Sequence, residues 1–181
     1  AIGKNVNQFS LNIYEVKDDV TNFLKYVSNS YDKNNFSAIK KSLVRKEIFR
    51  LPNLNDFQNH QTSLEIKPLP SGIYLVEYVV ENGIQDHFYF IATSSRLIYD
   101  QKDDRKSIED RLKLVHREIG KPISNEGLKI FEYSRGKTVN TYNIKSDNAA
   151  NFKFPVSKDK DYYRYFLVQQ PKTNDYNLIQ A

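Results

Sequence analysis

Residues 72–92 read GIYLVEYVVENGIQDHFYFIA, and this stretch restricts most strongly what the chain can fold into. The runs on both sides of Asn82-Gly83 are rich in β-branched and aromatic residues, a composition typical of strands. Asn-Gly is the preferred pair for a tight hairpin turn, because both turn positions need a positive φ. The sequence therefore predicts an antiparallel hairpin with strands over 73–81 and 85–93.

Upstream of this hairpin the pattern changes from strand to helix. Residues 8–16 alternate apolar and polar side chains, which predicts a strand with one buried face. In the next segment, apolar residues recur at helical spacing over 20–27, behind an aspartate (Asp18 or Asp19) that can cap a helix. We therefore expect a short helical insertion near residues 18–42.

The last third of the chain repeats short strand-like segments, such as LKLVHRE, LKIFEYS and YYRYFLVQQ, with turn residues between them. Residues 62–67 alternate in the same way and predict one further strand in the first block. Strands that recur every 8–12 residues or so are typical of all-β sandwiches. A charged stretch at 100–111 separates the two blocks. The sequence predicts an all-β fold of two tandem immunoglobulin- or fibronectin-like β-sandwich domains, over residues 1–104 and 105–181.

Composition narrows the class of protein. The chain has no cysteine, which removes disulfides, thiolate metal ligands and cysteine nucleophiles. The mean hydropathy of −0.66 and the lack of a long apolar run exclude a transmembrane helix. The chain has no methionine, begins at Ala1 and shows no signal peptide, so we expect a segment of a longer protein whose targeting signal lies outside it. The net charge is +5, but basic and acidic residues are interleaved, as on a solvated surface, so we predict no nucleic-acid partner.

Patterns for catalysis and metal binding are missing from the sequence. The three histidines, His60, His87 and His116, share no metal-ligand spacing. No calcium-binding loop, nucleophile elbow, P-loop or G-x-G-x-x-G pattern occurs. The sequence predicts that the chain is not an enzyme and has no catalytic residue, cofactor or metal site.

An aromatic cluster, YYRYF, occupies residues 162–166. In a strand, Tyr163 and Tyr165 lie on one face and the other three residues on the opposite face. An outward aromatic face can stack on sugar rings or bases. The alternative, which we favour, is that one face fills the core and the tyrosines of the other line a seam between domains or lie half-exposed. Tyr163 and Tyr165 are therefore the candidate exposed aromatic contact residues.

Two blocks of the sequence resemble domains of a known family. FSLNIYEVKDDVTNFL, followed by LPSGIYLVEYVVENG and HFYFIATSSRLIY, resembles a macroglobulin-like (MG) domain near the N-terminal end of bacterial alpha-2-macroglobulin family proteins. The segment from LVHREIGKPISNEGLKIFEYS to NFKFPV is similar to the domain that follows it. Two departures stand out: DNAANF replaces the glycine that usually follows the aspartate turn, and the insertion at 17–42 enlarges the first block.

The resemblance implies a non-catalytic structural segment of a large envelope protein, in the periplasm or at the surface of a bacterium. Some family members trap proteases, because cleavage of a bait region exposes a thioester that reacts with the attacker. The thioester needs a C-x-E-Q sequence, so in a chain without cysteine that chemistry would lie outside the segment. The implied partners are neighbouring domains of the same polypeptide and proteases bound through the full-length protein. A membrane would be reached only through an anchor outside the segment.

Two other functions remain open from the sequence. One is a surface adhesin or glycan-binding module that uses exposed tyrosines. The other is an interaction domain of a surface nutrient-uptake system, which the pattern of the second block also allows.

Overall fold

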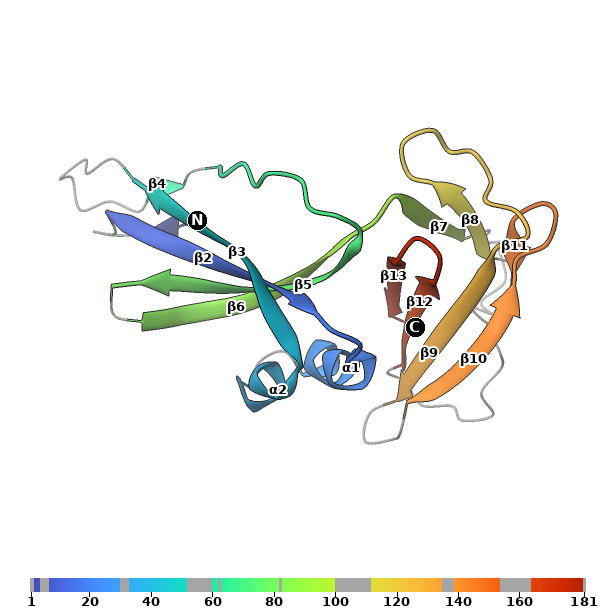
Figure 1. Ribbon diagram of the computed structural model, residues 1–181, viewed down its shortest axis with the longest axis horizontal. Coiled ribbons are helices and arrows are strands. Elements are labelled where there is room, and N and C mark those ends of the chain that lie inside the picture. The colour runs from blue at the N-terminus through green and yellow to red at the C-terminus, as the bar shows by residue number, and fades with distance from the viewer. Residues whose placement is uncertain are drawn as a thin grey trace.

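The computed structural model describes residues 2–3, 7–29, 33–51, 60–61, 63–81, 83–99, 112–134, 139–153 and 164–180. Two lobes lie side by side along its long axis (Figure 1). Within each lobe, every strand pair among the described residues is antiparallel. The predicted all-β class is confirmed. None of the helices in these ranges is both long and apolar enough to cross a bilayer.

The first lobe is built on a four-stranded sheet in the order β3-β2-β5-β6. Its strands are β2 (Gln8–Val16), β3 (Lys41–Arg50), β5 (Gly72–Val80) and β6 (Gly83–Ala92), and the short strands β1 (Ile2–Gly3) and β4 (His60–Gln61) pair with each other. The predicted hairpin is β5–β6, and the first predicted strand is β2. Gly83 has a φ of +102°, a conformation that glycine adopts readily, whereas Asn82 lies outside the described residues.

The predicted helical insertion follows β2. It contains α1 (Val20–Ser28) and the shorter α2 (Lys33–Ala38). Asp19 is the N-cap of α1, because its carboxylate accepts the backbone N–H of Asn22 at 3.4 Å. The same carboxylate accepts the N–H of Lys40 at 2.8 Å, which ties the end of the insertion to its beginning.

Both faces of the first sheet are covered, and β5 is therefore buried without a break from Gly72 to Val76. The helices cover one face (Figure 1). On the other face, segment 63–70 supplies the half-buried Leu64, Ile66 and Leu69, which pack on the buried side chains of β2 and β5. The strand predicted at 62–67 is wrong in one respect. Residues 63–67 alternate inward and outward side chains as predicted, but no described strand pairs with them, and residue 62 lies outside the described residues.

Arg45 on β3 holds segment 63–70 in place of a partner strand. Its guanidinium donates to the carbonyl oxygen of Lys67 at 2.7 Å and to that of Pro68 at 3.2 Å. It also donates to the carboxylate of Glu47 at 3.1 Å. Main-chain carbonyls outside a sheet need donors from elsewhere, and the arginine provides them here.

The second lobe is a sandwich of two sheets, β10-β9-β12-β13 and β11-β8-β7. Its strands are β7 (Ser95–Tyr99), β8 (Leu112–His116), β9 (Gly127–Ser134), β10 (Asn140–Lys145), β11 (Asn151–Phe152), β12 (Arg164–Gln170) and β13 (Asp175–Gln180). The buried side chains between the sheets are Leu97, Leu112, Leu114, Leu128, Ile130, Phe152, Phe166, Val168 and Ile179. Since strand residues alternate in direction, β9 and β12 also present side chains to the first lobe.

Strand pairing assigns β7 to the second lobe. β7 pairs with β8, from Ser95 opposite His116 to Tyr99 opposite Leu112. The chain therefore leaves the sheet of the first lobe at Ala92 and enters a sheet of the second lobe at Ser95. This is earlier in the chain than the division that we predict after residue 104. The charged stretch 100–111 lies outside the described residues, and the domains 1–104 and 105–181 stay a prediction.

Candidate functional site

The two lobes meet in one apolar cluster, which we call the junction core. α1 contributes Phe23 and Leu24, both fully buried. The buried members of the junction core are Phe23, Leu24, Tyr26, Phe36, Ile39, Ile73, Leu75, Tyr133, Leu167 and Tyr176. They come from α1, α2, Ile39 just after α2, and β5 of the first lobe and from β9, β12 and β13 of the second. Because burying one side chain of this size contributes roughly 1.5–3 kcal/mol, the shared cluster strongly favours the joined lobes.

A buried carboxylate lies beside the junction core, at the start of β13. Asp175 is 1% exposed. It accepts hydrogen bonds from the hydroxyls of Ser71 at 2.8 Å and Thr93 at 3.0 Å, and from Ser94 through the backbone N–H at 2.7 Å and the hydroxyl at 2.8 Å. Ser71 precedes β5, and Thr93 and Ser94 connect β6 to β7. One side chain of the second lobe thus binds two separate segments of the first.

The hydrogen bonds to Asp175 decide its charge. Burial by itself raises the pKa of the carboxyl, but bonds from the N–H and hydroxyl of Ser94 and the hydroxyls of Ser71 and Thr173 outweigh burial and lower it. The group is therefore ionised at neutral pH. Four bonds to a charged acceptor make this a strong attachment between the lobes.

A second buried polar group, Ser95, extends this attachment. Its hydroxyl oxygen accepts hydrogen bonds from the side-chain amides of Gln170 at 2.5 Å and Asn177 at 2.8 Å. Ser95 is the first residue of β7, and its partners lie on β12 and β13, which belong to the opposite sheet of the sandwich. The polar contacts at the junction therefore also link the two sheets of the second lobe.

His87 joins β6 to both helices of the insertion. Its Nδ1 lies 3.0 Å from the hydroxyl of Tyr26 on α1, and its ring stacks on Phe36 of α2 with the centroids 4.6 Å apart. Burial, followed by the nearby Asp86 and Tyr89, raises the pKa of Tyr26 to about 12. His87 is half-buried and His116 exposed, and the two lie in different lobes. This arrangement gives His87 a packing role.

The structure describes one of the two predicted aromatic contact residues, Tyr165. Tyr165 is half-buried and packs against the junction core, opposite Tyr133 on β9. Its position matches the seam between lobes rather than an open surface. Tyr163 lies outside the described residues.

Two buried acids could not be recognised in the sequence, because their partners are distant. Asp175 is one, and its partners lie 81 to 104 positions away along the chain. The other is Glu132 on β9, which is 1% exposed. Glu132 accepts a hydrogen bond from the hydroxyl of Tyr142 at 2.8 Å and lies 3.5 Å from the guanidinium of Arg164. Both contacts stay within the second lobe, so we assign Glu132 to its internal packing.

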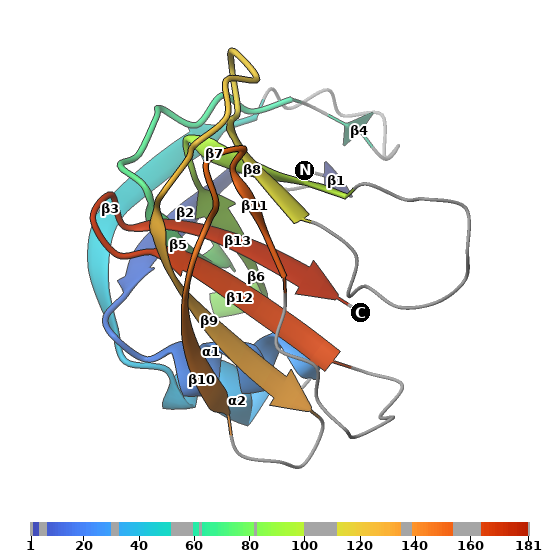
Figure 2. The same ribbon diagram turned by 90° about the vertical axis from the view of Figure 1, so that its right-hand side faces the viewer.

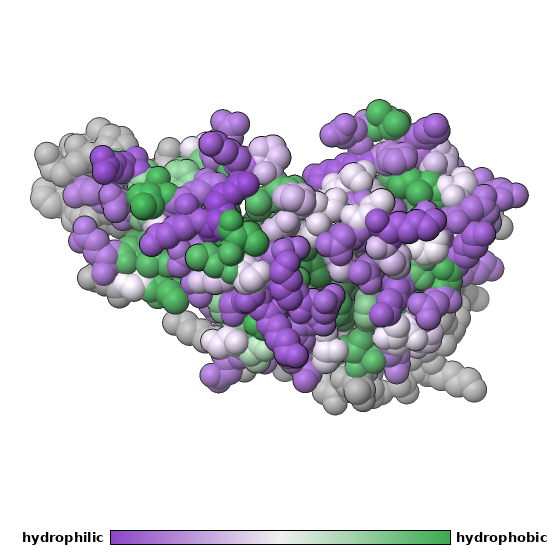
Figure 3. Space-filling view, in the orientation of Figure 1, coloured by the Kyte–Doolittle hydropathy of each residue, from purple (hydrophilic) through white to green (hydrophobic). Residues whose placement is uncertain are grey.

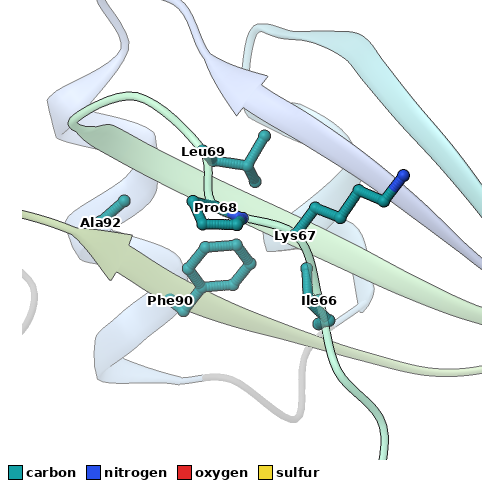
Figure 4. Close-up of a pocket in the computed structure, with 6 residues that line it drawn as sticks. All are labelled: Ile66, Lys67, Pro68, Leu69, Phe90 and Ala92. Atoms are coloured by element: carbon teal, nitrogen blue, oxygen red, sulfur yellow. The ribbon is translucent and has the colours of Figure 1, made fainter.

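A pocket of about 250 Å³ lies between segment 63–70 and β6. Its lining consists of Ile66, Lys67, Pro68, Leu69, Phe90 and Ala92. Figure 4 shows the Lys67 side chain directed away from the other lining residues, so mainly apolar groups face the pocket. Within the described ranges, no three His, Cys, Asp or Glu side chains gather where they could hold a metal ion. The junction core and the hydrogen bonds to Asp175, by contrast, join the two lobes to each other.

No family model and no curated protein matches the sequence. Among solved structures, the chain is similar to native alpha-2-macroglobulin from Escherichia coli, in a structure spanning domains MG0-NIE-MG1. The TM-score is 0.67 at 20% sequence identity, and the likeness covers 99% of this chain but 56% of the other. At this identity the likeness shows the fold. The fold that the sequence resemblance predicts is thereby confirmed.

Proposed function

We propose that this chain is a non-catalytic structural segment of a bacterial alpha-2-macroglobulin-like protein. The observation that carries the proposal is the fold likeness to the Escherichia coli protein over 99% of the chain. The resemblance of FSLNIYEV, LPSGIYLVEY and the second block to macroglobulin-like domains supports the same family from the sequence. Since one fold can host unrelated functions, both lines support the assignment without testing it.

Within such a protein, the segment would hold neighbouring parts of the polypeptide in a fixed relation. A scaffold of this kind needs lobes that do not swing independently. The junction core and the four hydrogen bonds to Asp175 resist such motion, the first by apolar burial and the second by direction-dependent contacts. Contacts between domains in one chain allow relative motion by default, unless the interface is large and hydrophobic.

The parent protein would act outside the cytoplasm, in the periplasm or at the cell surface, and would trap proteases. The bait region and the thioester would lie elsewhere in the polypeptide, because this chain has no cysteine. Its direct partners would be adjacent domains, and proteases would be reached only through the complete protein.

The position of Tyr165 favours this scaffold over glycan binding, because a tyrosine packed in the junction has little of its ring available for a sugar. A glycan array on the 181-residue chain compares the two functions. We expect no specific binding. Binding that is specific and is lost in Tyr163→Ala/Tyr165→Ala would contradict a purely structural role.

Protease trapping is tested on the parent protein that carries this segment. The protein is incubated with an endoprotease, and a covalent adduct of higher mass is sought on a denaturing gel. We expect the adduct with the natural sequence and with the exposed control Asp18→Asn, and a reduced yield with Asp175→Ala. A parent protein that is cleaved without retaining the protease argues against trapping, whatever the fold of this segment.

A further inference from the structure

The outer edge of β3 is open within the described part of the chain. β3 ends the sheet order β3-β2-β5-β6, and no described strand pairs with its outer side. Figure 2 shows β3 as the outermost ribbon at the left of the molecule. An open edge presents main-chain N–H and C=O groups with which another extended segment can pair.

The opposite edge of the same sheet, on β6, is capped by side chains. The backbone N–H of His87 donates to the carboxylate of Asp86 at 2.8 Å. The backbone carbonyl of His87 accepts from the hydroxyl of Tyr26 at 3.4 Å. Both main-chain groups of this residue, in the middle of the strand, are therefore occupied. Such capping discourages an added strand, and β3 does not show it among the described residues.

Apolar side chains are concentrated on β3. Seven large apolar residues in the described ranges are exposed, and three of them lie on this strand. These are Leu43 at 55%, Val44 at 44% and Ile48 at 59% exposed. In Figure 3, apolar side chains stand among polar ones on the left-hand lobe, where β3 faces the viewer in Figure 1. Exposed apolar residues grouped on one strand are typical of an interaction surface, whereas single ones are ordinary.

The charge on β3 indicates what kind of partner would bind. The strand carries Lys41, Arg45, Lys46 and Arg50 but one acid, Glu47. Lys46 and Arg50 are exposed and lie on the same face as Ile48, because side chains alternate along a strand. Edge-to-edge pairing with a second copy would place like charges near each other, which is destabilising. A partner that brings carboxylates is favoured instead.

A bulge sets the length of edge that can be used. The pairing of β3 with β2 shifts register at Val44, between Arg45 opposite Ile13 and Leu43 opposite Tyr14. Bulges bend a strand and interrupt its ladder of hydrogen bonds. The regular part available to a partner is therefore Arg45–Arg50.

We propose that the edge of β3 over Arg45–Arg50 binds an extended polypeptide segment as an added strand. On one face the segment presents a carboxylate, an apolar side chain and a second carboxylate at alternate positions. Its carboxylates lie next to Lys46 and Arg50, and its apolar side chain covers Ile48. Main-chain hydrogen bonds along the edge supply affinity, and the side chains of that face supply specificity. The proposal does not depend on the function proposed above.

The test uses the 181-residue chain and a synthetic peptide with the core Glu-Thr-Val-Thr-Glu. Chemical shifts of the backbone amides are followed while the peptide is added at low ionic strength. We expect shift changes confined to β3 and its neighbour β2. A Lys-Thr-Val-Thr-Lys peptide should bind at least about tenfold more weakly, which corresponds to about 1.4 kcal/mol. Added salt should weaken the binding of the acidic peptide, because salt screens the attraction between exposed charges.

Two variants make the test specific. Ile48→Glu should lower the affinity for the acidic peptide by at least about tenfold, which corresponds to about 1.4 kcal/mol of binding free energy. The matched control is Ile98→Glu on β7, where the side chain is 45% exposed, and it should leave binding unchanged. Equal binding of both peptides, shift changes centred on β6, or no binding at about 1 mM overturns the proposal. A dimer in sedimentation equilibrium that Ile48→Glu dissociates also overturns it, because the occupant is then a second copy.

Discussion

The carboxylate of Asp175 accepts the backbone N–H of Ser94 at 2.7 Å, although the two residues are 81 positions apart in the chain. Ser94 lies in the connection between β6 and β7, where the chain passes from one lobe to the other. Asp175 is the first residue of β13, the last strand. The bond therefore fixes the point at which the lobes join to the end of the fold, and Ser71 extends the attachment to the start of β5.

Asp175→Asn should lower the free energy of unfolding by about 2–4 kcal/mol. The amide keeps one acceptor oxygen but loses the charge, and at least one of the buried donors at Ser71, Thr93 or Ser94 is left without an acceptor. A buried donor left unsatisfied costs about 1–3 kcal/mol, and hydrogen bonds to charged groups are worth about 1.5–3 kcal/mol. Urea unfolding followed by circular dichroism measures the change.

The matched control for this variant is Asp18→Asn. Asp18 is exposed and has a φ of 51°, a conformation that asparagine tolerates well. Its substitution should change stability by less than about 0.5 kcal/mol. If both variants lose the same free energy, the attachment at Asp175 has no special role in stability.

The stability contributed by Asp175 should depend on pH in the acid range. Hydrogen bonds lower the pKa of the folded carboxyl below its unfolded value of about 3.9. The contribution is therefore complete above the unfolded value and is lost as the pH falls through the folded value. Asp147 also has a lowered pKa, chiefly through the N–H of Asn151, so the comparison must be made against Asp175→Asn. The gap in unfolding free energy between the two proteins should be constant above about pH 5 and should narrow as the pH falls below about 4, and a gap that stays constant to about pH 2 would argue against the assignment.

Leu24→Ala should destabilise both lobes together. Leu24 is fully buried in the junction core, to which β5 of the first lobe and β12 of the second also contribute. Removing a buried leucine side chain costs about 2–5 kcal/mol. Amide hydrogen exchange should show β5 and β12 losing protection in parallel, because both strands contribute buried side chains to this core. Leu43→Ala, at a position 55% exposed, serves as the control and should change stability by less than about 0.5 kcal/mol. Loss of protection in one lobe alone would mean that the lobes unfold independently.

Local patterns account for the elements that the sequence predicts well. Apolar alternation over 8–16 gives β2, helical spacing behind Asp19 gives α1, and the apolar runs around Asn82-Gly83 give the β5–β6 hairpin. Each of these depends on side chains within one short segment. The alternation over 62–67 is equally clear, yet the segment pairs with no described strand. Alternation shows that one side of a segment is buried, but not that the segment pairs with a strand. Here Arg45 bonds the main-chain carbonyl of Lys67 in place of a partner strand.

The contacts that join the lobes could not be predicted from local patterns. The sequence around Asp175, KTNDYNL, is an ordinary turn followed by a strand, and nothing in it distinguishes a buried aspartate from a solvated one. The distinction arises from Ser71 and Ser94, which the fold brings to it over long distances in sequence. The pairing of β7 with β8 could not be predicted from local sequence either, because a short strand can join either neighbouring sheet. Tyr165 could be placed on a face of its strand, but not against a particular lobe.

Ala150 occupies a backbone conformation that favours glycine, at the point where the sequence departs from the macroglobulin-like pattern. Its φ is +64° and its side chain is fully buried, in the turn before β11. The turn is held by Asp147, whose carboxylate accepts the N–H groups of Ala149 and Asn151, both at 2.8 Å. The left-handed conformation costs a residue with a Cβ about 1–2 kcal/mol.

Ala150→Gly should therefore leave the free energy of unfolding unchanged within about 1 kcal/mol. Relief of the strain is offset by the loss of a buried methyl group, worth about 0.8 kcal/mol, and by the greater freedom of glycine in the unfolded chain, worth roughly 0.5–1 kcal/mol. The matched control is Ala92→Gly on β6, where no positive φ is relieved, so the same replacement should destabilise by about 1–2 kcal/mol. Ala150→Val should be the most harmful of the three, because a β-branched residue fits a positive φ poorly and the site is fully buried. Urea unfolding of the three variants gives the order of their unfolding free energies. A larger loss of stability for Ala150→Gly than for Ala92→Gly would show that the buried methyl group of Ala150 contributes more than the strain costs.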